Sequence, residues 1–155
     1  MEDSPVAAGT VIAERYQLER EIGQGGMGTV WRALHLTLQG PVAIKLIRAS
    51  LLDSAEAKAR FLREARSAAA LRSTHVVQIL DHGLHEELPF IVMELLLGES
   101  LADRLSRHGV LSLSETLQVV RPVCQALSLA HPRSSVHRDL KPDNIFIATD
   151  GALDG

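Results

Sequence analysis

The segment from Val136 to Asn144 is the densest group of side chains in the chain that can take part in a reaction. It reads Val-His-Arg-Asp-Leu-Lys-Pro-Asp-Asn, and the apolar run Ile145–Ile147 follows it. Asp139 can accept or orient a hydroxyl proton, and Lys141 can steady a phosphoryl group in transit. Asn144 can bind a metal ion through its amide oxygen. A solvated, charge-rich loop without a function is the alternative, and the motifs upstream argue against it.

A second candidate is the glycine-rich segment Gly23–Gly28, which satisfies the pattern G-x-G-x-x-G. The same letters mark dinucleotide-binding folds, but there a helix follows the motif. Here the β-branched and aromatic residues Thr29–Trp31 follow, which predicts a strand instead. A glycine loop between two antiparallel strands lets backbone N–H groups approach phosphate oxygens closely. A flexible hairpin turn that binds nothing is the alternative.

A third candidate is Lys45, which ends the segment Val-Ala-Ile-Lys on a predicted strand. A lysine that points inward among valine and isoleucine needs a partner, because an isolated buried cation is very costly. Glu64, on the helix predicted to follow, is the natural partner. Such a pair can hold the lysine extended toward the phosphates of a nucleotide. A surface lysine whose aliphatic stem lies along apolar neighbours is the alternative.

Five strands and one helix are predicted to position these residues. Alternating apolar residues predict strands within residues 16–22, 29–31, 42–46, 76–80 and 90–93. The helix between the third and fourth strands begins at Asp53, a plausible N-cap with Glu56 three residues further on. A polar turn at His85–Glu87 joins the last two strands. Beyond Gly98 the spacing becomes helical, so the chain is predicted to form two unlike lobes.

The helical part contains one long apolar stripe. Its members, spaced alternately four and three apart, are Leu113, Leu117, Val120, Cys124 and Leu127. This spacing is typical of one face of a helix. Because Cys124 lies on that face, we expect it to be an inert core thiol.

The composition excludes several classes of protein. The 155 residues are 46% hydrophobic and 23% charged, which is ordinary for a folded soluble domain and excludes wholesale disorder. A net charge of −3 gives no basic footprint for nucleic acid. A single cysteine excludes a disulfide framework and is typical of a reducing compartment. The N-terminus lacks a signal-peptide pattern, and the longest apolar stretch is far shorter than a membrane span. We therefore expect a cytoplasmic protein with no membrane segment.

Taken together, the motifs resemble a known family. The ordered set G-x-G-x-x-G-x-V, V-A-I-K, a helix glutamate and H-R-D-L-x-x-x-N resembles the eukaryotic-type protein kinases. Residues 22–31 and 137–144 look most like the bacterial serine/threonine branch, and Lys141, two residues after Asp139, is similar to the serine/threonine pattern. The resemblance implies an α+β, protein-kinase-like bilobal fold. Residues 10–94 would form an N-lobe with a five-stranded antiparallel sheet and one helix, and residues 95–155 part of a helical C-lobe, after a flexible lead-in at residues 1–9.

The resemblance also implies that ATP is bound. The nucleotide-binding residues would be Ile22, Gly23, Gln24, Gly25, Gly26, Met27, Gly28, Val30, Ala43, Lys45, Met93, Glu94 and Leu95. Val30 and Ala43 would cover the adenine ring, and Met93 would be the gatekeeper. Glu94 and Leu95 would offer backbone groups to the base.

The catalytic roles implied by the resemblance fall on four side chains and one metal ligand. Lys45 would contact the α- and β-phosphates and be held by Glu64. Asp139 would be the catalytic base, with Lys141 beside it. Asn144 would hold Mg²⁺. The implied reaction transfers the γ-phosphate of ATP to serine or threonine hydroxyls of a protein substrate.

The 155 residues depart from the family in one respect, because they contain neither D-F-G nor A-P-E. We therefore expect this chain to be inactive alone. We also expect the helix at residues 114–131 to expose an apolar face that the rest of a C-lobe, or another protein, would cover. A nucleotide-binding pseudokinase or regulatory fragment is one alternative. A small-molecule phosphotransferase of similar fold is another, although Arg138 and Lys141 argue against it.

Overall fold

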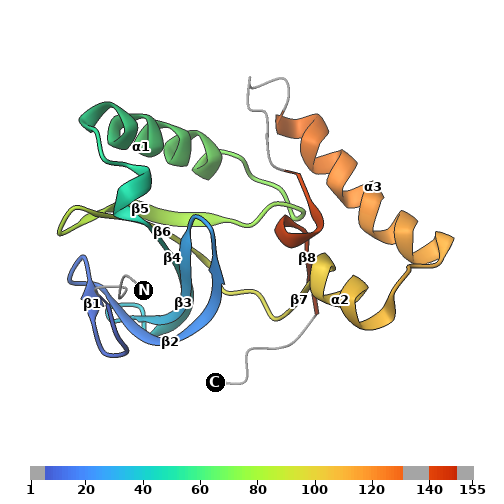
Figure 1. Ribbon diagram of the computed structural model, residues 1–155, viewed down its shortest axis with the longest axis horizontal. Helices are drawn as coiled ribbons and strands as arrows, with labels where there is room; N and C mark the ends of the chain where they lie inside the picture. Colours follow the sequence, from blue (N-terminus) through green and yellow to red (C-terminus); the bar gives the residue numbers. More distant parts are fainter. Residues whose placement is uncertain (1–5, 131–139, 150–155) are drawn as a thin grey trace. The chain divides into compact units, whose positions relative to one another are not determined.

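The computed structural model describes residues 6–130 and 140–149, and it divides the chain into two compact units. The first unit comprises residues 1–72 and 77–95, and the second comprises residues 73–76 and 96–155. Figure 1 shows a curled sheet with one long helix in the first unit, and helices with a short two-stranded sheet in the second. The predicted α+β class is confirmed.

The first unit is built on a six-stranded antiparallel sheet. Its strands are β1 (Val11–Ile12), β2 (Tyr16–Gly25), β3 (Gly28–His35), β4 (Gly40–Ile47), β5 (Ile79–His85) and β6 (Leu88–Glu94). Their order across the sheet is β1-β2-β3-β4-β6-β5. The sheet has one strand more than the five predicted, because β1 is too short to produce an alternation pattern. The polar turn predicted before β6 is present at Glu86 and Glu87, which both adopt a positive φ.

One face of this sheet carries the core of the unit. The buried cluster consists of Ile12, Tyr16, Leu18, Trp31, Ala33, Val42, Ile44, Leu46, Phe90 and Val92. Ile44 and Val92, which pair across β4 and β6, are completely buried. Because side chains alternate across a strand, Ala43 and Lys45 point to the opposite face from Ile44. The core thus holds β4 in place while its other face remains available for a site.

Helix α1 (Ala55–Ala69) follows the one-turn helix η1 (Ala49–Leu51) and contacts β5. Its N-cap is Ser54, whose side chain accepts a hydrogen bond from the Ala57 N–H at 3.0 Å. The predicted N-cap, Asp53, is therefore wrong by one residue. Ala57 and Ala65 are the buried residues of α1, so the helix lies close to the sheet through small side chains.

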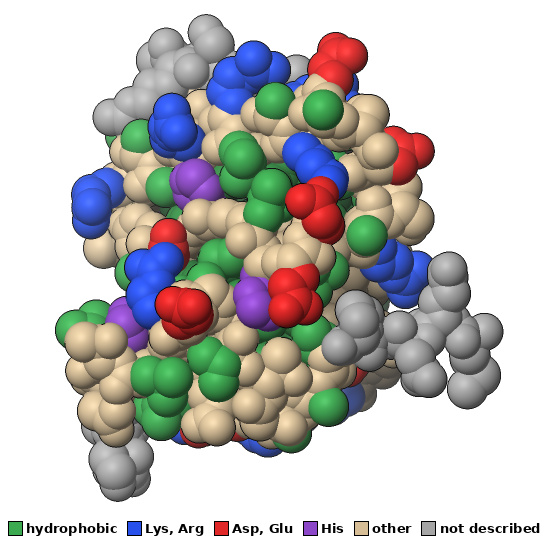
Figure 2. All heavy atoms as spheres, turned by 90° about the vertical axis from the view of Figure 1, so that its left-hand side faces the viewer, with side chains coloured by type: hydrophobic (Ala, Val, Ile, Leu, Met, Phe, Trp, Pro, Cys, Tyr) green, Lys and Arg blue, Asp and Glu red, His purple; other side chains and the backbone are tan. Residues whose placement is uncertain are grey.

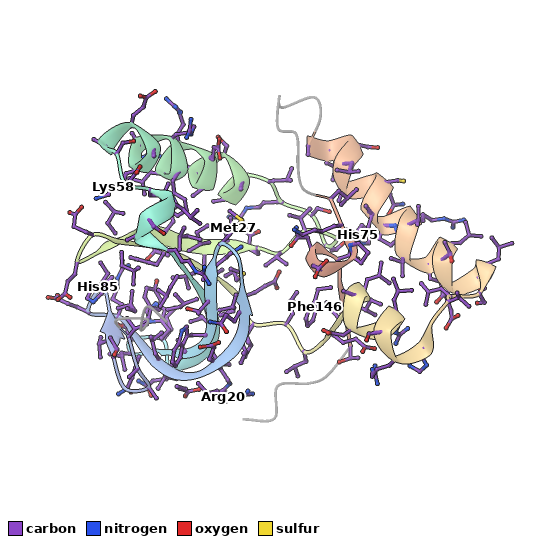
Figure 3. The ribbon with its side chains drawn as sticks, in the orientation of Figure 1. Arg20, Met27, Lys58, His75, His85 and Phe146 are labelled. Carbon is purple, nitrogen blue, oxygen red and sulfur yellow. The ribbon has the colours of Figure 1, made fainter. Side chains whose placement is uncertain are left out.

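A polar network ties the β1–β2 turn to β5. The Tyr16 hydroxyl donates to Asp81 Oδ2 at 2.8 Å, and Arg15 forms an ion pair with the same oxygen at 2.9 Å. The Ala13 N–H donates to Nδ1 of His85 at 3.3 Å, at the end of β5 labelled in Figure 3. Burial, assisted by the hydrogen bond to Asp81, raises the pKa of Tyr16 to about 12.

This raised pKa predicts an alkaline limit to stability. The folded-state pKa of Tyr16 lies above the value of about 10 for an unfolded tyrosine. The stability that neutral Tyr16 contributes is therefore complete below about pH 10 and is lost as the pH rises toward about 12. We expect the urea midpoint to fall over this range, and the substitution Tyr16→Phe to flatten the decline. Tyr16 is the only tyrosine, so tyrosinate absorbance reports its titration alone. A midpoint near pH 10 in the folded protein would contradict the expectation.

The second unit contains three helices and a short sheet within its described residues. Its elements are β7 (Gly98–Ser100), α2 (Leu101–His108), α3 (Leu113–Ala130), the one-turn helix η3 (Pro142–Asn144) and β8 (Phe146–Ala148). β7 pairs with β8 antiparallel. The strand predicted at Ile145–Ile147 is confirmed with a shift of one residue.

Helix α3 exposes the apolar stripe found in the sequence. The exposed fractions of Leu113, Leu117 and Val120 are 78%, 51% and 47%. Cys124 is exposed as well. The prediction of an exposed apolar face is thus confirmed, whereas the prediction that Cys124 is a core thiol is wrong. The buried end of the helix is Ala130.

The surface of the first unit mixes charges of both signs. On the face drawn in Figure 2, Lys and Arg side chains lie beside Asp and Glu, with histidines among them. The ion pairs of this unit include Lys58–Glu87, which joins α1 to the β5–β6 turn, and Arg32–Glu19.

Among the described helices, none has the length and apolar character needed to cross a membrane.

Candidate functional site

The glycine-rich segment forms the β2–β3 hairpin. Gly25 pairs with Gly28, so only Gly26 and Met27 form the loop, and Met27 is labelled there in Figure 3. The strands therefore extend further into the glycine motif than the predicted turn allowed. The Arg48 N–H donates to the Met27 carbonyl at 3.0 Å, which fixes the loop to the end of β4. The sequence alone gave no signal for this contact.

Gly28 has a specific role in the hairpin. Its φ is +150°, and a Cβ atom at this position would lie 1.9 Å from the backbone oxygen of Leu46 on β4. Gly25 and Gly26 have no atoms within 4 Å of such a Cβ. The last glycine of the motif is thus required for the close approach of β3 to β4, whereas Gly25 and Gly26 leave the backbone of the loop uncovered.

The strand register brings four predicted nucleotide-binding residues onto one face of the sheet. Val30 pairs with Lys45, and Ala43 pairs with Met93. Directly opposite residues point to the same side of a sheet, and so do residues two apart on a strand. Val30, Ala43, Lys45 and Met93 therefore share the face opposite the core. Gly23 pairs with Val30 and continues this face to the glycine hairpin.

Two further predicted residues, Ile22 and Glu94, lie at the borders of this face. Ile22 is the extra residue of a bulge between the pairs formed by Glu21 and Gly23, and 40% of its surface is exposed. The Glu94 N–H donates to the Gln78 carbonyl at 3.1 Å. The Glu94 carboxylate in turn accepts a hydrogen bond from the Gln78 N–H at 2.8 Å. Gln78 thus holds the end of β6, a role that the sequence did not indicate. Leu95, the next residue, is half-buried.

Glu64 lies on α1, and its side chain is exposed. Lys45 is half-buried on β4. The predicted pairing of Lys45 with Glu64 stays a prediction, and Lys45 is not without a partner in this structure. Glu64 is exposed because α1 faces the sheet through Ala57 and Ala65.

The predicted residues of the segment 136–144 are only partly described. Asp139 lies outside the described residues. Lys141 precedes η3 and Asn144 ends it, and both side chains are exposed. The Asn144 N–H donates to the Lys141 carbonyl at 2.9 Å, so one tight turn carries both residues. In the described part of the chain, no group of three or more His, Cys, Asp or Glu side chains could hold a metal ion.

Comparison with known proteins decides the family. A family model described as the protein kinase domain matches residues 16–153. The chain belongs to the protein kinase family. Among the relatives of this kinase chain, the serine/threonine-protein kinase pkn3 of Myxococcus xanthus is 40% identical over 146 residues, which cover 94% of the chain and 27% of pkn3. The serine/threonine-protein kinase PknB of Mycobacterium tuberculosis is 38% identical over 146 residues, which cover 92% of the chain and 23% of PknB.

Solved structures agree with this assignment to the kinases. The kinase domain of PknI from Mycobacterium tuberculosis matches with a TM-score of 0.84 at 29% identity, over 93% of this chain and 58% of that one. A double mutant of the same domain gives a TM-score of 0.87 at 28% identity, over 94% of this chain and 60% of that one. The kinase chain described above thus spans about a quarter of its curated relatives' length and somewhat over half of the solved kinase domain.

Proposed function

We propose that this chain is the ATP-binding part of a serine/threonine protein kinase. The whole enzyme would transfer the γ-phosphate of ATP to serine or threonine hydroxyls of a protein. The observation that carries the proposal is the shared sheet face of Val30, Ala43, Lys45 and Met93 beside the glycine hairpin. The relatives pkn3 and PknB are named serine/threonine-protein kinases, which supports the same substrate class.

The sheet face would bind the nucleotide in two parts. Val30 and Ala43 offer apolar surface that suits an adenine ring, with Met93 next to Ala43 across the strands. Lys45 adds a positive charge on the same face, and a charged hydrogen bond from lysine to phosphate is stronger than a neutral one. The hairpin loop would close over the phosphates, because Gly25 and Gly26 leave its backbone N–H groups uncovered.

The remaining roles concern the base of the nucleotide and the reaction itself. The carbonyl of Glu94 and the backbone of Leu95 would receive the adenine edge, since the Glu94 N–H already donates to Gln78. Asp139 would accept or orient the substrate hydroxyl proton, and Lys141 would steady the phosphoryl group. Glu64 on α1 would hold the lysine.

The amide oxygen of Asn144 is a ligand of the kind that Mg²⁺ prefers. Mg²⁺ prefers oxygen ligands, keeps several waters and is usually bound by few protein groups together with substrate phosphates. The exposed amide of Asn144 offers one such oxygen. When bound, the metal would neutralise charge on the phosphates. Asn144 would therefore hold Mg²⁺ that arrives with ATP, not a metal held by protein alone.

Binding without turnover is the second candidate function. It is favoured by the lack of D-F-G within these residues. We propose that the 155 residues alone bind nucleotide but transfer no phosphate. Further polypeptide of a kinase helical lobe would cover the exposed face of α3. The single cysteine, which is typical of proteins in a reducing compartment, supports the cytoplasm as the place of action.

Two assays on the 155-residue chain test this proposal. We expect ATP with Mg²⁺ at millimolar concentration to raise the melting temperature, because a ligand that binds only the folded state stabilises it. We expect radiolabelled ATP to transfer no more label to protein with this chain than with its Asp139→Asn variant. Absence of any thermal shift would contradict nucleotide binding. Label transfer that Asp139→Asn abolishes would contradict inactivity, and transfer to an amino sugar but not to protein would favour the small-molecule alternative.

A further inference from the structure

We propose that Gly98 is a positioning residue for the turn that carries Lys141 and Asn144, although more than forty residues separate them in the chain. The inference rests on the proposed function insofar as it assigns Asn144 a metal and Lys141 a phosphoryl group. The positioning itself rests on contacts within the second unit alone.

Strand β7 and helix α2 hold the end of this turn. Both elements contact η3. Gly98 pairs with Ala148 on β8, and the Leu101 N–H, the first of α2, donates to the Ile145 carbonyl at 2.8 Å. On the far side, the Thr149 N–H donates to the Leu97 carbonyl at 2.8 Å. The residue directly after Asn144 is therefore bonded to the start of α2.

The backbone hydrogen bonds within the turn join residues that are three apart in the chain. Within η3 and its borders, the backbone bonds are Asn144 N–H to the Lys141 carbonyl at 2.9 Å and Ile145 N–H to the Pro142 carbonyl at 3.3 Å. A single turn of this length is marginal without outside support. The bonds that β7 and α2 supply therefore help to fix the location of Asn144.

Gly98 makes the β7–β8 contact possible. Its φ is +139°, and a Cβ atom here would lie 2.1 Å from the backbone oxygen of Ile147 and 3.2 Å from Cα of Ala148. Both atoms belong to backbone, so no side-chain rotation can relieve the overlap. Any residue other than glycine would push β7 away from β8.

Side-chain bonds make β7 and α2 move together. Glu99 accepts a hydrogen bond from Arg104 at 3.0 Å and forms an ion pair with Arg107. Ser100 caps α2 by accepting from the Asp103 N–H at 3.0 Å. A displacement of β7 at Gly98 is thus transmitted to the Leu101 N–H that holds Ile145.

The test compares Gly98→Ala with Gly109→Ala in the 155-residue chain. Gly109 lies at the other end of α2 with a φ of +79°, but no atom lies within 4 Å of its Cβ position. Both variants therefore carry backbone strain, and only Gly98→Ala carries the overlap. We measure amide hydrogen exchange at Leu101 and Thr149, and the broadening of the Asn144 side-chain amide signal by Mn²⁺ with ATP.

We expect Gly98→Ala to speed exchange at both amides by about tenfold or more, because local opening exposes them. We expect it to abolish the Asn144 broadening, while Gly109→Ala changes exchange by less than about twofold. Equal exchange in the two variants, or retained broadening in Gly98→Ala, would overturn the proposal. If Gly98→Ala speeds exchange but Mn²⁺ with ATP does not broaden the Asn144 signal even in the unmodified chain, the positioning role of Gly98 is supported. The metal role of Asn144 is then overturned.

A second variant covers the case in which Gly98→Ala unfolds the whole unit. Glu99→Gln weakens the bonds to Arg104 and Arg107 without any backbone overlap. We expect faster exchange at Leu101 in this variant, with the α3 amides unchanged. Unchanged exchange at Leu101 would overturn the proposal.

Discussion

Replacing Gly28 with alanine is expected to lower the free energy of unfolding of the first unit by about 3 kcal/mol. Two features cause this loss. The φ of +150° at this position strains any residue other than glycine, and the new Cβ would lie 1.9 Å from the Leu46 carbonyl oxygen. β3 must then separate from β4 at the base of the hairpin. The Arg48–Met27 hydrogen bond, which fixes the loop, lies next to this point, so ATP affinity should fall as well.

The measurement is urea unfolding followed by the fluorescence of Trp31. This residue is the only tryptophan and belongs to the core of the same unit. Gly26→Ala is the matched control, because its Cβ would meet nothing within 4 Å and its φ is not positive. We expect the control to change stability by less than about 0.5 kcal/mol. Equal midpoints for the two variants would show that the close approach at Gly28 is not required.

The residues of the sheet face proposed to bind nucleotide were predictable from the sequence because their signals are local. The glycine motif, the valine that follows it and the Val-Ala-Ile-Lys strand each depend on a few adjacent letters. Alternation then places Ala43 and Lys45 on the face opposite Ile44. The pairing of Val30 with Lys45 and of Ala43 with Met93 places all four residues on one face.

Contacts between distant elements were not predictable in the same way. The spacing of α1 does not determine how the helix sits on β5, and this placement leaves Glu64 exposed. Similarly, periodicity shows that Leu117, Val120 and Cys124 share a face, but not whether another element covers it. That is why Cys124 was expected in a core and is exposed.

Two smaller differences have equally physical causes. Asp53 and Ser54 are adjacent residues that both favour the N-cap, and only the backbone geometry at Ser54, with its bond from the Ala57 N–H, distinguishes them. The glycines at 28 and 98 were visible as letters, but the close backbone approaches that require them depend on strand pairing in three dimensions.

Removing the charge of Lys45 is expected to weaken ATP binding by about 10- to 100-fold, because a hydrogen bond to a charged group contributes about 1.5–3 kcal/mol. Lys45→Met keeps the length of the side chain and its apolar contacts on β4. Its neighbour Val30 and the core on the other side of the strand remain in place, so the loss should appear in affinity more than in stability.

Lys58→Met is the matched control. Lys58 lies on α1, as Figure 3 shows, and forms an ion pair with Glu87 at the β5–β6 turn. It does not belong to the sheet face that carries Lys45. Both variants remove one positive charge from the first unit, so a general electrostatic effect on a nucleotide would appear in both.

Calorimetric titration of ATP with Mg²⁺ into the unmodified chain and these two lysine variants tests the central claim most directly. The sheet face opposite the core is predicted to give saturable binding that Lys45→Met weakens by at least about tenfold and Lys58→Met changes by less than about twofold. No saturable binding to the unmodified chain, or an equal loss in both variants, would contradict the assignment of a nucleotide to this face.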